Sequence, residues 1–112
     1  MFKINQSSTY TWPVTVSLAT SGGKFEEHHF DAEFKRLSES DLKKIAERID
    51  KGTITDRALV QEVMVGWDGI TNSDEPLPFS QGNLNQLLDI NGVAAGIVKA
   101  FFDSVSGRDR KN

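Results

Sequence analysis

The N-terminal part of the chain alternates between apolar and polar positions. In the segment TYTWPVTVSLA, residues 9–19, polar threonines and a serine hold the odd positions around Pro13. The apolar residues of the other parity are Trp12, Val14, Val16 and Leu18. A period of two is typical of a strand with one buried face. Since Pro13 cannot donate to a ladder, we expect this strand to lie at a sheet edge or to begin there.

A second alternating segment follows, FEEHHFDAEFKRL at residues 25–37, with Phe30, Ala32 and Phe34 on one face. Phe25 has the opposite parity, which predicts a bulge or a late start of the strand. The connecting letters TSGGK carry paired glycines, which supply positive φ at low cost and indicate a turn. The two segments predict an antiparallel hairpin, which needs another layer to pack on.

Four later segments show helical spacing of apolar residues. We expect Ser38, Thr55 or Asp56, and Ser80 to cap the first three, and Gly52 to end the first. The Asn91-Gly92 pair separates the third from the fourth. The segments are residues 37–52, 54–67, 80–90 and 92–105.

The last of these segments, GVAAGIVKAFFDSV, is apolar or small around much of its circumference. Phe101 and Phe102 are adjacent, so both cannot easily face one core. Two interpretations stay open: a central helix of the α layer, or a helix with one face for a partner. The small residues Ala94–Gly96 permit close approach by another segment. The candidate partner-binding residues are Trp12, Val14, Phe101 and Phe102.

These patterns predict an α+β fold in which a two-stranded N-terminal hairpin packs on about four helices. We expect one domain at residues 1–106 and a flexible polar tail at residues 107–112. No internal repeat or interdomain linker is apparent.

The amino-acid composition excludes several classes of function for this protein. The chain has 112 residues and a net charge of −3, so bulk attraction to nucleic acid is not expected. It has no cysteine, which excludes disulfides, thiol catalysis and thiolate zinc sites and fits a reducing cytoplasm. We expect no signal peptide and no membrane segment, because no apolar run is long enough.

The segment VGWDGITNSDEPLPFSQGNLNQLL, residues 65–88, has the acidic and amide residues of a possible calcium loop. The EF-hand spacing fails, however, because Ser73 stands where the loop needs Gly and Phe79 where it needs Glu. A looser divalent site at Asp68, Asp74 and Glu75 stays open. The alternative is a polar structural joint.

In that alternative, the prolines at positions 76 and 78 keep the joint out of helix. Trp67, Leu77 and Phe79 are then the structural anchors that fix the segment to the core. We prefer this interpretation.

The sequence gives little support to a metal site of another kind or to a catalytic site. His28 and His29 are neighbours on a strand, so they point to opposite faces and cannot chelate one metal together. The carboxylates lie among lysines and arginines on polar faces, and no phosphate-binding glycine motif or nucleophile elbow occurs. We therefore predict no catalytic, metal-binding or cofactor-binding residue and no enzyme activity. A small metal-dependent enzyme is the alternative.

Several segments in order resemble the tail assembly chaperones of long-tailed bacteriophages and prophages. They are YTWPVTVSLATSGG, DAEFKRLSESDL and the long stretch from VMVGWDGI through PLPFS and LLDI to AFFDSVSG, followed by a final KN. The similarity covers residues 9–112, and residues 65–79 carry its most specific part. One departure is that NSDEPLPFS has no Gly between its acidic residues and its prolines, which leaves the turn geometry open.

The resemblance implies a non-enzymatic protein of the host bacterial cytoplasm. It would bind the phage tape measure protein during tail construction, self-associate, and be absent from the mature virion. It implies no cofactor, nucleic acid or membrane as a partner, and the tail tube protein is a further candidate partner. The alternative is a minor structural tail protein that stays in the virion.

Overall fold

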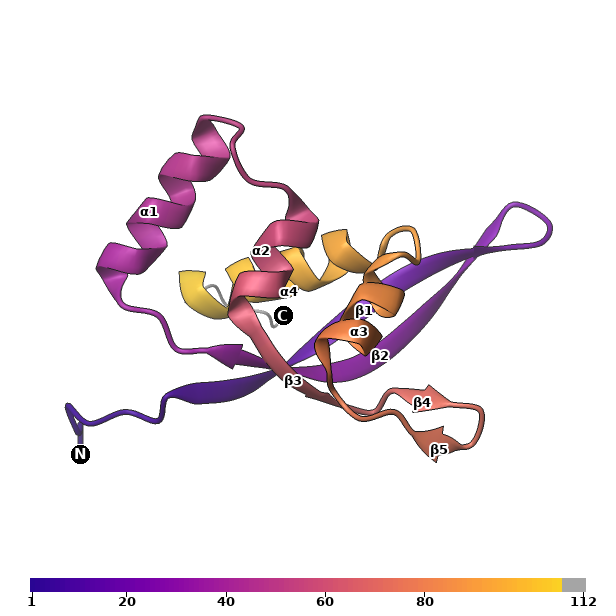
Figure 1. Ribbon diagram of the computed structural model, residues 1–112, viewed down its shortest axis with the longest axis horizontal. Coiled ribbons are helices and arrows are strands. Elements are labelled where there is room, and N and C mark those ends of the chain that lie inside the picture. The colour runs from indigo at the N-terminus through magenta and orange to yellow at the C-terminus, as the bar shows by residue number, and fades with distance from the viewer. Residues whose placement is uncertain (108–112) are drawn as a thin grey trace.

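The computed structural model describes residues 1–107, so the prediction for the tail beyond residue 107 lies outside the described residues. Five strands and four helices follow one another along this part of the chain (Figure 1). They are β1 (Thr9–Thr20), β2 (Lys24–Lys35), α1 (Glu39–Asp50), α2 (Asp56–Val63), β3 (Met64–Asp68), β4 (Thr71–Asn72), β5 (Glu75–Pro76), α3 (Gln81–Leu88) and α4 (Val93–Ser106). The predicted α+β class is confirmed.

The predicted hairpin is confirmed as the antiparallel pair β1–β2, joined by a glycine-rich turn. The pairing is regular from Thr9 with Lys35 to Thr20 with Lys24. Phe25 therefore lies in the ladder without a bulge, and its side chain is exposed because the tip of the hairpin extends past the helices (Figure 1). Phe25 can lie on the opposite face from Phe30 and Phe34 because this end of the hairpin is exposed to solvent.

The predicted two-stranded hairpin is only part of the main sheet, because β3 pairs with β2 and completes a sheet of order β1-β2-β3. The sequence pattern had suggested a helix through residues 54–67, but α2 ends at Val63. Met64 and Trp67 then pair with Phe34 and Ala32, and the register shifts between these pairs because Val65 is an extra residue in β3. A second, two-stranded sheet consists of β4 and β5.

Pro13 lies on β1, which is an edge strand of this sheet, as its missing N–H predicts. The N–H of Arg36 donates to the carbonyl of Ser8 over 2.8 Å, so even-numbered β1 residues form the hydrogen-bonded pairs with β2. The odd-numbered residues, including Pro13, turn their backbone groups toward the free edge.

The predicted helix starts are confirmed. The hydroxyls of Ser38, Thr55 and Ser80 each accept a hydrogen bond from the backbone N–H three residues on. These caps satisfy donors that a helix leaves unpaired in its first turn. Gly92 precedes α4 in the left-handed conformation, with φ 93°.

The core lies between one face of the main sheet and the layer formed by α2, α3 and α4 (Figure 1). Its largest fully buried side chains include Phe34 of β2, Leu59 of α2, Leu84 of α3 and Phe101 of α4. Phe34 and Phe101 meet edge to face, with ring centroids 5.3 Å apart. The last helix is thus the central helix of the α layer, the first of the two interpretations left open.

α4 lies directly on β1 because Gly96 has no side chain. A Cβ at this position would stand 2.8 Å from Cγ1 of Val16 and 2.9 Å from the carbonyl oxygen of Thr15. The close approach expected from Ala94–Gly96 is therefore present. It also brings α4 over part of the free edge of β1.

Candidate partner-binding surface

The four predicted partner-binding residues divide into two pairs. Val14 and Phe101 are fully buried in the core, so they offer no surface to a partner, and this part of the prediction has to be corrected. Trp12 and Phe102 are half-buried and pack against the core from its margin. The sequence missed the division because Phe101 and Phe102 are adjacent, and periodicity alone does not decide which one faces inward.

Trp12 lies in a shallow groove between β1, α1 and α4, which we call groove A. Tyr10 and Trp12 of β1, Leu37 before α1, Leu42 of α1 and Val105 of α4 supply its apolar lining. All five side chains are half-buried, so part of their apolar surface stays open to solvent. Arg36 borders the groove and lies over the ring of Tyr10, 4.9 Å from its centroid.

A second groove, which we call groove B, lies between α1 and α2. Leu37 borders both grooves, and groove B continues past Ile45 of α1 to Val63 at the end of α2. Its polar margin contains Lys35 and Lys44. Together the two grooves flank the base of α1.

Arg48 and Glu62 bridge groove B with a bidentate ion pair. The guanidinium nitrogens of Arg48 donate to the two carboxylate oxygens of Glu62 over 2.9 and 2.8 Å. These hydrogen bonds lower the pKa of Glu62, and the charges of Arg48 and Lys35 act in the same direction. Both side chains are more than 40% exposed, so water screens the attraction.

The charge around the grooves is opposite in sign to that of the whole chain. With the Arg48–Glu62 pair set aside as neutral, the groove margins hold the cations Lys35, Arg36 and Lys44 and the single carboxylate of Asp41. The net charge is thus +2, from three cations and one carboxylate, in a chain of net charge −3. A positive local potential favours an occupant that carries carboxylates.

The predicted anchors meet in one cluster. The indole Nε1 of Trp67 donates to the carbonyl of Leu77 over 2.7 Å, and its ring meets Phe79 edge to face at 4.9 Å. The N–H of Leu77 donates to the carbonyl of Ile70. These contacts close the β4–β5 hairpin against the end of β3 and lead the chain into α3, which fits the structural joint.

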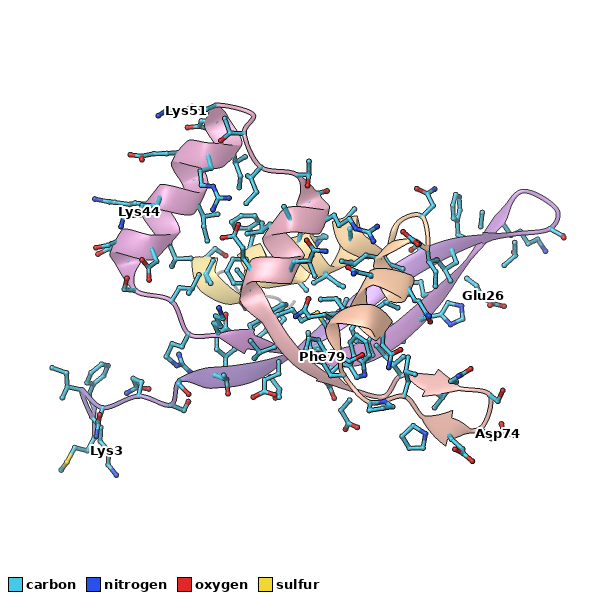
Figure 2. All side chains as sticks on the ribbon, viewed as in Figure 1. Lys3, Glu26, Lys44, Lys51, Asp74 and Phe79 are labelled. Atoms are coloured by element: carbon cyan, nitrogen blue, oxygen red, sulfur yellow. The ribbon has the colours of Figure 1, made fainter. Side chains whose placement is uncertain are left out.

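The carboxylates considered for a divalent site lie around this small hairpin. Asn72 pairs with Glu75, and Asp74 is at the exposed turn (Figure 2). Ser73 adopts φ 57°, a left-handed conformation in which Gly is usual. Within residues 1–107, no three His, Asp or Glu side chains are grouped as metal ligands would be.

The two histidines point to opposite faces of the hairpin, as expected. Nε2 of His28 is 3.2 Å from a carboxylate oxygen of Glu26, whereas Nδ1 of His29 is 2.9 Å from the hydroxyl of Thr15. Each imidazole thus has its own neighbour on its own face.

The grooves could be foreseen only in part. Helical spacing had identified Leu42 and Ile45 as apolar positions of α1. Leu37, Arg36 and Val105 gave no signal, because their meeting depends on where α1 departs from the sheet. Among the described helices, none combines the length and the apolar character needed to cross a bilayer.

The chain matches no protein-family model, no curated protein sequence and no solved structure.

Proposed function

We propose that this protein is a tail assembly chaperone that binds the tape measure protein while a long phage tail is built. The observation that carries the proposal is the ordered set of sequence segments, above all residues 65–79 followed by the LLDI sequence of residues 87–90, at the end of α3. The Trp67 cluster gives residues 65–79 a structural purpose, since it joins β3 to α3.

The physical properties of the surface are compatible with this role. A tape measure protein is long and largely helical, and its apolar stripes would aggregate before tail subunits cover them. A small acidic chain with half-open apolar grooves can cover such stripes with moderate affinity per copy. Many copies on one tape measure chain add avidity, and self-association between neighbouring copies strengthens it further.

The proposed role requires no catalysis, so the protein is a non-enzymatic binding module. It acts in the host cytoplasm and leaves the tail before the virion is complete. The tail tube protein is a second candidate partner at the stage when tube subunits replace the chaperone.

Co-expression with the tape measure protein of the same phage or prophage tests the proposal. We expect a soluble complex that survives size-exclusion chromatography, whereas the tape measure protein expressed alone precipitates. An insoluble tape measure protein in both cases, with this chain running free, would contradict the proposal.

Mass spectrometry of purified particles distinguishes the chaperone from the alternative, a minor structural tail protein. A chaperone is absent from the particles and abundant in the lysate. A constant number of copies per virion would support the structural protein instead.

A further inference from the structure

The surface around α1 has three properties that together define an occupant: its shape, its apolar lining and its charge. α1 is inclined away from α4, and the loop of residues 51–55 and the Arg48–Glu62 pair join it to α2 (Figure 1). Ile45 is its only buried residue, and Ile49, one turn farther along the same face, is 42% exposed. In the distal half of this helix, Ile49 therefore presents apolar surface that residues 1–107 cover only in part.

A partner strand is a poor occupant for this region. Strand addition needs a row of free donors and acceptors on the edge of β1. Pro13 has no donor, and α4 closes the edge farther along, where Gly96 and Gly92 approach the carbonyl oxygens of Thr15 and Ser17. The edge that remains is too short for a stable ladder.

A helix fits the same region better. Groove A runs between α1 and α4, and apolar side chains from both helices, Leu42 and Val105, line its walls. A helix laid in such a groove buries one apolar stripe, with anchors spaced three and four residues apart. Its polar flanks then meet the groove margins, where Lys35, Arg36 and Lys44 outnumber the carboxylate of Asp41.

We propose that grooves A and B, with the inner face of α1, seat an amphipathic helix of the partner whose apolar stripe is flanked by Asp and Glu. The identity of the partner in this inference rests on the proposed function. The apolar lining and the positive charge of the binding site do not depend on it. α1 forms one wall of this helix-binding site, and Ile49 extends the apolar surface that the partner helix contacts.

Two synthetic helical peptides test the chemistry directly. Both carry the same Leu and Ile stripe, and their flanking positions are all Glu in one and all Lys in the other. Titrated into the isotope-labelled full chain, the Glu peptide should shift the amide resonances of Leu37, Leu42, Ile49 and Val105 saturably. The Lys peptide should bind about tenfold more weakly or worse.

A charge variant and a matched control sharpen the result. The K35E/K44E variant reverses the charge at the groove margins and should weaken the Glu peptide by about tenfold. The K3E/K24E variant changes the net charge equally at two exposed sites outside the grooves and should bind like the wild type. All four positions are exposed, so the fold should tolerate the changes.

The proposed helix-binding site would be refuted if neither peptide binds, if the two peptides bind equally well, or if the Lys peptide binds more tightly. Amide shifts confined to β3 or to the tip of the hairpin would also refute it. If concentrating the protein alone shifts the same amides, a second copy occupies the grooves and the partner helix is wrong. Loss of tape measure binding in the co-expression experiment would refute the function and leave the peptide result standing. If K35E/K44E leaves tape measure binding unchanged, the proposed helix-binding site is refuted and the proposed function is not.

Discussion

α1 and α4 are both amphipathic helices of similar length, yet they are held in different ways. α4 contributes four buried residues and approaches β1 so closely that Gly96 has no space for a Cβ. α1 contributes only Ile45, and a solvent-exposed ion pair between Arg48 and Glu62 supports it from one side. An apolar stripe in a sequence thus identifies the inner face of a helix, but not how tightly that face is packed.

The largest expected difference follows from truncating one apolar side chain on each helix. Phe101→Ala should destabilise the protein by roughly 3–5 kcal/mol, because it leaves a cavity beside Phe34. Ile49→Ala on α1 should cost about 1 kcal/mol or less, because 42% of the residue is already exposed to solvent. Urea denaturation measures both values.

Similar losses of stability in Phe101→Ala and Ile49→Ala would contradict the conclusion that α4 is packed more tightly than α1. If Phe101→Ala does not fold, Phe101→Leu keeps most of the volume and should still cost more than the Ile49 variant.

A smaller effect, but one of opposite sign at the two positions, is expected from adding a methyl group to two helical glycines. Gly96→Ala should destabilise by about 1–3 kcal/mol, because the new Cβ meets Val16 and the carbonyl of Thr15. Gly82→Ala on α3 has open space around it and should stabilise by a few tenths of a kcal/mol to about 1 kcal/mol. Thermal melts of the two variants should therefore move in opposite directions.

A stabilised Gly96→Ala variant would show that α4 can move away from β1 at no cost, and the distinction between the helices would weaken.

The smallest effect concerns the ion pair that supports α1. The hydrogen bonds from Arg48 lower the folded-state pKa of Glu62, so the pair stabilises the fold above the unfolded pKa of about 4.3. This contribution is lost as the pH falls through the lower, folded pKa. In Arg48→Gln, the pKa of Glu62 should rise toward its usual range, and the loss of stability between neutral and acidic pH should shrink.

Carboxyl NMR titration measures the pKa of Glu62 in both proteins. An unchanged value in Arg48→Gln would mean that the ion pair does not hold α1 in solution.

Local sequence signals predicted the hairpin and the helix starts, because alternation and caps act over a few residues. Ser38, Thr55 and Ser80 cap as expected, and Pro13 lies on an edge strand. The strand β3 was missed because its apolar residues also continue the helical spacing of α2. Only pairing with β2, distant in sequence, decides between the two.

The candidate surface was predicted least well. Of the four predicted residues, Trp12 lines groove A, Phe102 is not among the residues that line either groove, and Val14 and Phe101 belong to the core. Grooves A and B arise from the angle at which α1 leaves the sheet after Leu37, and no spacing of residues encodes that angle.

The projecting β1–β2 hairpin gives the molecule an elongated shape, 47 Å by 34 Å by 34 Å, with the hairpin roughly along the long axis (Figure 1). Such a body rotates anisotropically in solution. N–H bonds in an antiparallel ladder are perpendicular to the strands, whereas those of a helix follow its axis, and α4 runs alongside β1. Equally rigid amides in β1 and α4 will therefore relax at different rates in NMR experiments, and that difference will report their orientation rather than their mobility.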